Sequence, residues 1–208
     1  MREKSGHGSR LTARLCRGSS RLSGKPPSGQ VSAGKMNIFI LDEDPVIAAQ
    51  AQCDKHVVKM VLESAQMLST THRLLGEDHQ VFYKTVHQNH PCTVWTRQSS
   101  GNYLWHLAHW TALCDEYRHR YQKVHKTDQR LRQAFGQLPA NLPKGPRTPF
   151  ALALGDHDDC RCDDAVETYR RYYLQKQNQF VMRWTRRPPP SWMRHEKAFY
   201  RTNRRVDK

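Results

Sequence analysis

The sequence predicts a mainly α-helical fold, namely a compact single-domain helical bundle with a short N-terminal extended segment and disordered basic tails. Two observations support this prediction. Apolar residues recur at helical spacing over residues 53–75 and 102–124, and residues that typically start or stop helices flank these stretches. A chain of 208 residues is long enough to bury one sizeable core, so we expect one domain.

The first elements follow from their capping residues. Residues 37–41, NIFIL, predict a short buried strand or extended segment. Asp44 followed by Pro45 is typical of an N-cap and first helical residue, so a helix begins there. Asp54 is a candidate second N-cap, which would place His56 in the first turn of the long helix at 53–75. Gly76 is expected to stop that helix.

The later elements are predicted from apolar periodicity and from breakers. A helical segment is expected up to Gln98 after His90-Pro91, and a strongly periodic helix over 102–124. Glycines and prolines make 125–147 a loop-rich connection with one short helix around 131–135. We expect Asp164 to cap a last helix whose aromatic face extends to Trp184, ended by the prolines at 188–190.

Positive charge is concentrated at both ends of the chain. Residues 1–35 contain eight basic residues and one acidic residue, residues 183–208 contain nine and two, and residues 36–182 contain 17 and 16. The middle is therefore nearly neutral and the ends are polycationic. Such ends favour a polyanionic partner, with DNA the expected one and an acidic membrane surface the lesser alternative.

These shifts in composition divide the chain into a disordered basic extension at 1–35, a helical domain at 36–192 and a basic tail at 193–208. The extension fits either a transit peptide or an upstream segment translated from an early start codon, and we favour the second because Met36 opens an apolar segment. No run of 18 apolar residues predicts a membrane span. Six cysteines without a CxxC pair favour a reduced, cytoplasmic protein; the oligomeric state is not indicated.

The long helix carries a polar stripe of ionisable side chains. At about 100° per residue, His56, Lys59 and Glu63 fall on one arc, beside an apolar face formed by Val57, Val58, Val61, Leu62, Ala65 and Leu68. A base, a cation and a carboxylate therefore share one face. The alternative is a solvated face held by an ion pair between Lys59 and Glu63. The candidate catalytic residues of this helix are Asp54, Lys55, His56, Lys59 and Glu63.

Histidines and amides near the next two helices are candidates for lining a pocket. They are Asn89, His90, Asn102, His106 and His109. His106 lies at the centre of an apolar face, where a buried structural histidine is the alternative. The acidic stretch at 156–164 is interpreted as a solvated loop, since metal ligands normally converge from separate elements, and we expect no metal and no cofactor. No Walker loop, dinucleotide fingerprint, GxSxG or HExxH motif occurs.

The C-terminal region combines cationic and flat aromatic side chains, a combination suited to clamping a phosphate backbone and stacking on an unpaired base. The candidate DNA-binding residues are Arg183, Trp184, Arg186, Arg187, Trp192, Arg194 and Lys197. The alternative is a solvated basic tail with Trp184 and Trp192 packed into the core.

The motifs MNIFILD, CDKHVVKM, NHPCTVW, NYLWHL, TPFALAL and YRRYY resemble a family of small phage and bacterial proteins. More distantly, the run from Asp54 to Val57 followed by Glu63, and Arg187-Pro188 with Trp192, are similar to the pyrimidine-dimer DNA glycosylase (endonuclease V type) of T-even phages. This resemblance implies a compact all-helical fold in which a histidine and a glutamate of an early helix lie near the scissile glycosidic bond.

The resemblance also implies a nucleophile, because that family attacks with its own N-terminal amine. Here a 35-residue extension or an initiator Met36 precedes Asn37. Lys55 or Lys59 is then the candidate for Schiff-base chemistry; otherwise Glu63 would activate water and give a glycosylase without lyase activity.

We therefore expect the helical domain to be a catalytic and DNA-binding unit that excises a damaged or modified base, in repair or in phage–host conflict, after flipping it out of the duplex. Two alternatives remain open: a phage-type DNA base-modifying transferase, and a non-enzymatic DNA-binding accessory protein.

Overall fold

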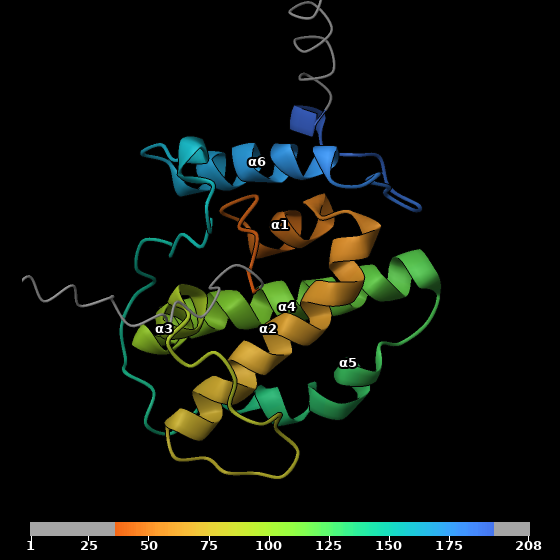
Figure 1. Cartoon of the computed structure of the whole chain (residues 1–208). Coiled ribbons are helices and arrows are strands. Elements are labelled where there is room, and N and C mark those ends of the chain that lie inside the picture. Colours follow the sequence, from red (N-terminus) through yellow and green to blue (C-terminus); the bar gives the residue numbers. More distant parts are fainter. Residues whose placement is uncertain (1–35, 194–208) are drawn as a thin grey trace, which may run out of the picture. The chain divides into compact units, whose positions relative to one another are not determined.

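A computed structural model describes residues 36–193 of the chain, and these residues are mainly helical, as predicted. The described residues form six α-helices and no β-strand (Figure 1). The helices are α1 (Pro45–Ala51), α2 (Asp54–Leu74), α3 (Pro91–Gln98), α4 (Ser100–Tyr121), α5 (Lys126–Leu131) and α6 (Ala165–Gln175), with short 3-10 turns η1 (Ala134–Gly136), η2 (Asp158–Cys160), η3 (Lys176–Asn178) and η4 (Ser191–Met193). The predicted disorder of 1–35 and the tail beyond Met193 fall outside the described residues.

The first described residues are extended and lie in the core. Met36 to Leu41 are all less than 9% exposed. They pair with no strand among the described residues, because Phe39 has a left-handed backbone with φ of 56° that breaks the extended run. The side chain of Asn37 fixes this bend: its Oδ1 accepts the Phe39 N–H at 2.9 Å, and its Nδ2 donates to the Ala153 carbonyl at 2.7 Å.

The starts and stops of α1 and α2 follow the sequence with one correction. Asp44 caps α1 by accepting the N–H groups of the next turn, and Pro45 is its first residue, as predicted. The cap of α2 is Cys53, so the prediction that Asp54 is the N-cap was wrong by one residue; Asp54 is the first helical residue instead. Gly76 follows the end of α2 with a positive φ of 93°, a conformation that glycine adopts without strain.

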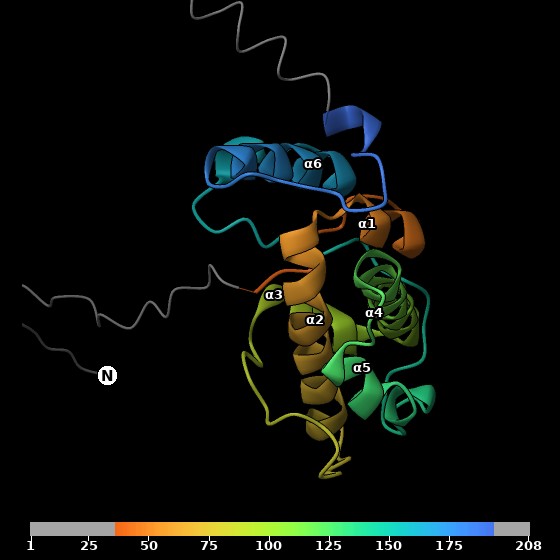
Figure 2. The ribbon, with the colours of Figure 1, turned by 90° about the vertical axis from the view of Figure 1, so that its right-hand side faces the viewer.

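Helix α2 packs across α4, and the two views show this crossing from perpendicular directions (Figures 1 and 2). Val57, Val61, Ala65 and Leu68 are fully buried there, as the periodicity predicted. Trp110 of α4 links the two helices by donating its indole N–H to the Val61 carbonyl at 3.0 Å. The predicted apolar face was too wide, however. Val58 and Leu62 lie on the outside, 40% and 39% exposed.

The loop at 143–148 lies directly against the start of α4. A side chain at Gly101 would come within 2.2 Å of the Arg147 backbone nitrogen, so this contact requires glycine. Ser99 caps α4, and Ser100 and Gly101 belong to the helix, so α4 begins two residues before the predicted start at residue 102. The predicted short helix around 131–135 is displaced as well: α5 ends at Leu131, and only a 3-10 turn follows.

The end of α6 is the main error in the predicted fold. Asp164 caps α6 as predicted, but the helix ends at Gln175 rather than near Trp184. Beyond η3 the chain makes tertiary hydrogen bonds in place of helical ones: the Arg183 carbonyl accepts the Asp54 N–H at 2.8 Å, and Trp184 donates its indole N–H to Ala51 at 3.0 Å. These bonds hold the C-terminal segment 183–187 on the start of α2.

Candidate active site and DNA-contact residues

Glu63 is a largely buried carboxylate in the middle of α2. Its side chain is 13% exposed, and its Oε1 lies 2.9 Å from the Nζ of Lys59, which is 50% exposed. Its Oε2 is buried and has no hydrogen-bond partner among the described residues. Burial raises the pKa of Glu63, and Lys59 and the nearby Asn37 backbone oppose this rise without cancelling it. A buried carboxylate oxygen without a partner is costly, and groups of this kind are often found at functional sites.

His56 lies two turns before Glu63 on the same helix and is buried, 7% exposed. The Tyr173 hydroxyl accepts the Cys53 backbone N–H at 2.8 Å and lies 2.7 Å from His56 Nδ1. The hydroxyl can donate to Nδ1 or accept from it, so the tautomer of the imidazole sets the direction of this hydrogen bond. Burial lowers the pKa of His56 to about 3, helped by the positive charges of Lys176, Lys59 and Lys55. The ring is neutral at physiological pH.

The other two candidates in the first turn of α2 have different surroundings. The Nζ of Lys55 lies 4.4 Å from the centre of the Phe180 ring. Asp54 accepts hydrogen bonds from Arg120 at 3.0 Å and from the Thr185 N–H and hydroxyl at 2.9 and 2.7 Å. With both oxygens engaged, Asp54 holds the C-terminal segment on α2 and α4, which is a structural role.

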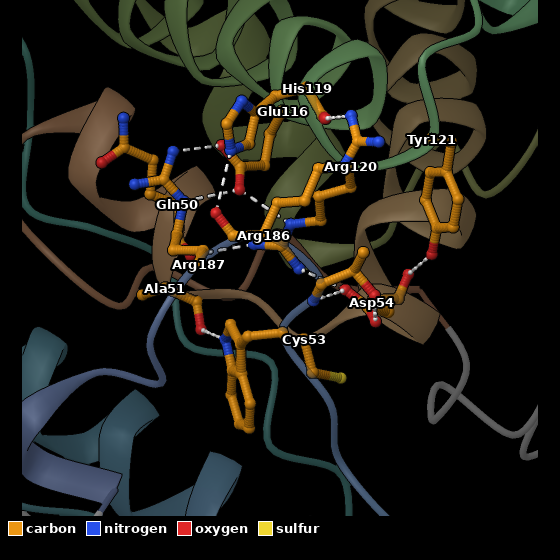
Figure 3. Close-up of polar contacts among 12 residues, drawn as sticks. Gln50, Ala51, Cys53, Asp54, Glu116, His119, Arg120, Tyr121, Arg186 and Arg187 are labelled. Atoms are coloured by element: carbon orange, nitrogen blue, oxygen red, sulfur yellow. Dashed lines mark hydrogen bonds and ion pairs between the residues drawn. The ribbon is translucent and has the colours of Figure 1, made fainter.

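Asp54 belongs to a network of charges that joins α1, α2, α4 and the C-terminal segment (Figure 3). Glu116 of α4 accepts a hydrogen bond from Nε of Arg120 at 2.7 Å. It also accepts two from Arg187, from Nε at 2.7 Å and from Nη2 at 2.8 Å. Burial alone would raise the pKa of Glu116, but the two arginines outweigh it and lower that pKa. Arg187 was predicted to contact DNA, yet its charge is already paired inside the protein.

The remaining C-terminal candidates divide into exposed cations and packed aromatics. Arg183 and Arg186 are exposed, and Arg186 donates to the His119 carbonyl at 3.4 Å. Trp184 and Trp192 are half-buried against the core, which agrees with the alternative reading in which they are packing residues. Arg194 and Lys197 lie outside the described residues.

The candidates for lining a pocket are mostly structural. Asn102 is fully buried and holds the loop at 143–148, since its Nδ2 donates to the Trp95 carbonyl at 2.8 Å and its Oδ1 accepts the Thr148 N–H at 2.7 Å. His90 is buried and caps α3 by accepting the Cys92 N–H. Asn89, next to it, is exposed.

His106 and His109 are both fully buried in α4. His106 Nδ1 lies 2.7 Å from the Thr96 hydroxyl, and His109 Nε2 lies 3.3 Å from the Gln52 amide. Burial lowers the pKa of His109 to about 3 and also lowers the pKa of His106 well below its usual value. Within residues 36–193 no three His, Cys, Asp or Glu side chains converge as metal ligands would. The two histidines are core residues.

A surface pocket of about 620 Å³ lies along α1 and α4. Its lining includes Val46, Gln50, Leu104 and Thr111, with Arg187 at one side, and it includes neither His56 nor Glu63. It is therefore separate from the polar stripe of α2. No helix of the described residues combines the length and the apolar character needed to cross a membrane.

The match to a known family falls on the part of the chain that contains this stripe. Residues 36–129 match the pyrimidine dimer DNA glycosylase family. The match covers the extended segment, α1 to α4 and the start of α5, so both His56 and Glu63 lie within it. At the level of the family, it supports a DNA glycosylase function and DNA as the partner. Comparison with curated proteins and with solved structures found no match.

Several residues around His56 lie outside the matched range or were missed in the sequence. Tyr173 in α6, Lys176 in η3 and Phe180 after it lie beyond residue 129, and Phe39 was predicted only as part of an extended segment. The Phe39 ring stacks on His56 at 4.7 Å, and Phe180 meets the same imidazole edge-on at 5.4 Å. No spacing rule links positions more than 100 residues apart, so only the fold brings these side chains together.

Proposed function

We propose that the protein is a DNA glycosylase that hydrolyses the N-glycosidic bond of a damaged or modified base and leaves an abasic site. The observation that carries this proposal is Glu63, a largely buried carboxylate with one unpaired oxygen, held 2.9 Å from the ammonium group of Lys59. It lies in the part of the chain that matches pyrimidine dimer DNA glycosylases.

The chemistry of the bond explains why such a carboxylate is useful. Breaking an N-glycosidic bond builds positive charge on the sugar, so a negative charge beside that sugar stabilises the transition state more than the substrate. Water bonds to C1′, the base leaves with the electron pair of the broken bond, and Glu63 accepts the proton of the water. Lys59 favours the ionised form of Glu63 that both roles require.

The decisive test is Glu63→Gln, which keeps shape and removes charge. We expect single-turnover base excision to fall by a factor of at least about 100, while DNA affinity in filter binding stays nearly unchanged. Glu167→Gln is the matched control, because Glu167 also pairs with a basic residue one turn away, Arg171, but is exposed. Full excision by Glu63→Gln would remove Glu63 from the mechanism.

The substrate is tested with ultraviolet-irradiated duplex DNA, with DNA carrying hypermodified phage bases, and with undamaged duplex. Strand breaks after alkali indicate abasic sites and identify the substrate base. A gain in mass of the base would instead indicate a base-modifying transferase, and binding without either change an accessory protein. We expect alkali-labile sites on one of the first two substrates and none on undamaged DNA.

The lyase step depends on an amine at the sugar. Lys59 lies within ion-pair distance of Glu63, whereas the ammonium group of Lys55 lies over the Phe180 ring. We propose Lys59 as the amine if a Schiff base forms. At a DNA concentration that saturates both variants, borohydride should then trap a covalent complex with DNA that Lys59→Gln abolishes and Lys55→Gln retains. An enzyme that excises the base but gives no trapped complex is a glycosylase without lyase activity.

A further inference from the structure

Two lysines beside His56 carry positive charges that no carboxylate among the described residues neutralises. Lys55 in α2 lies with its Nζ 4.4 Å from the centre of the Phe180 ring. Lys176, the first residue of η3, lies with its Nζ 4.4 Å from the Tyr172 ring and 5.6 Å from the Phe39 ring. The rings hold each ammonium group in place, but a ring face does not cancel a full charge.

The two cations share a neighbour. The His56 imidazole stacks on Phe39 and meets Phe180 at nearly a right angle, so rings that support Lys176 and Lys55 are also rings that contact His56. The positive charges of both lysines act on that imidazole, which is neutral and cannot add to or offset them. A positive potential therefore builds up over one small surface.

The backbone holds this arrangement at a cost. Phe39 has φ of 56°, and a bulky residue in this region costs on the order of 1–3 kcal/mol. That backbone conformation directs an aromatic ring toward both His56 and Lys176 rather than continuing an extended segment. Strain of this kind is found where a side chain must be held in a defined position.

We propose that Lys55 and Lys176 form a clamp for two neighbouring phosphodiester groups of the DNA strand, one at each lysine, with the rings of Phe39, Tyr172 and Phe180 as its supports. This inference rests on the proposed function, because it takes DNA as the ligand. His56 and Glu63 are seven residues apart, about 10 Å along the helix. A strand that follows α2 from the clamp thus reaches Glu63 within about three nucleotide rises.

The clamp is tested by the salt dependence of DNA binding. In the full chain, Lys55→Gln combined with Lys176→Gln should flatten the slope of log K against log salt on undamaged duplex by about 1.8, since each phosphate contact contributes about 0.9. Affinity at low salt should fall at least about tenfold. The matched control is Lys123→Gln with Lys144→Gln, two exposed lysines near opposite ends of α4, which should leave the slope unchanged.

Two further measurements keep the outcomes distinct. If the double variant does not fold, Lys55→Gln alone should flatten the slope by about 0.9, since Lys55 is exposed. An unchanged slope in a folded variant overturns the clamp. The clamp is also overturned if the double variant loses binding to phosphatidylserine vesicles while its salt slope on DNA is unchanged. The lysines would then face a membrane surface. A flattened slope together with full excision by Glu63→Gln would uphold the clamp and reject the proposed catalytic role of Glu63.

Discussion

Two cationic regions of the molecule contain similar side chains in opposite electrostatic settings. In the C-terminal segment, Arg187 forms two hydrogen bonds with Glu116, a carboxylate that is 3% exposed. Around His56, Lys55 and Lys176 face aromatic rings and no described carboxylate. Arg187 uses its charge to hold the fold together, whereas Lys55 and Lys176 leave their charges available.

This difference shows why counting basic residues does not locate a DNA-binding surface. The segment 183–187 has three arginines in five residues, so its sequence favours phosphate binding more strongly than two isolated lysines do. What decides is whether an internal carboxylate already neutralises each cation. An arginine bound to a buried carboxylate offers a phosphate little net charge unless that ion pair opens.

The largest expected effect is on the stability of the paired region. Glu116→Gln leaves Arg120, whose side chain is fully buried, and Arg187 with less compensation, and should lower the free energy of unfolding by about 3 kcal/mol. Urea denaturation measures this change. The exposed pair between Glu167 and Arg171 is the control, and Glu167→Gln should cost under about 1 kcal/mol. Equal losses in both variants would contradict the distinction between the two regions.

The next effect concerns pH. His56 and His109 have pKa values lowered to about 3 in the folded protein, against about 6.5 when unfolded. Between these values the unfolded chain binds more protons, so the free energy of unfolding falls as the pH falls from 6.5 towards 3. At pH 5 each histidine should account for about 2 kcal/mol of this loss. Urea denaturation of His109→Gln at pH 7 and pH 5 should show that the variant is less acid-sensitive than the parent.

The pKa of His56 also tests whether the charge of Lys176 lies close to the imidazole. The titratable groups facing His56 are Cys53, Lys55, Lys59, Tyr173 and Lys176. After burial, Lys176 is the largest cause of the lowered pKa of His56, so Lys176→Gln should raise that pKa while leaving it below 6.5. Nitrogen-15 NMR of the imidazole measures the change. An unchanged pKa of His56 would show that the charge of Lys176 does not act on the imidazole.

A smaller effect separates the two regions in DNA binding. Lys176→Gln should flatten the salt slope by about 0.9, whereas Arg187→Gln should reduce stability and leave the slope unchanged, because Arg187 is paired with Glu116. Both variants are measured on the same undamaged duplex. If Arg187→Gln flattens the slope as much as Lys176→Gln, the ion pair opens on DNA and the sequence-based assignment of Arg187 is right.

The smallest effect concerns the tyrosine that orients His56. Tyr173→Phe removes the hydroxyl that accepts the Cys53 N–H and hydrogen-bonds with His56 Nδ1, and should cost about 1 kcal/mol of stability. It should also change the balance of the two imidazole tautomers, which the nitrogen-15 shifts of Nδ1 and Nε2 report. Unchanged shifts would show that another contact fixes the ring.

Local chemistry in the sequence predicts much of the fold and part of the site. Asp44 with Pro45, and Gly76, mark helix ends because capping acts within a few residues. Helical periodicity likewise places His56 and Glu63 on one stripe. The end of α6 was not predictable, because hydrogen bonds from Trp184 and Arg183 to a distant helix replace the local pattern. Lys176 was missed as a neighbour of His56 for the same reason.

The left-handed backbone at Phe39 sets a limit for protein engineering. Glycine or asparagine at this position would adopt φ of 56° at lower cost, but either would delete a buried aromatic side chain, and that loss of about 3–5 kcal/mol outweighs the relief of strain. The replacement would also remove the ring that contacts His56, Tyr173 and Lys176 together. Relaxing the backbone here would therefore lower the melting temperature and disorder the surroundings of His56, so position 39 should stay fixed in protein engineering.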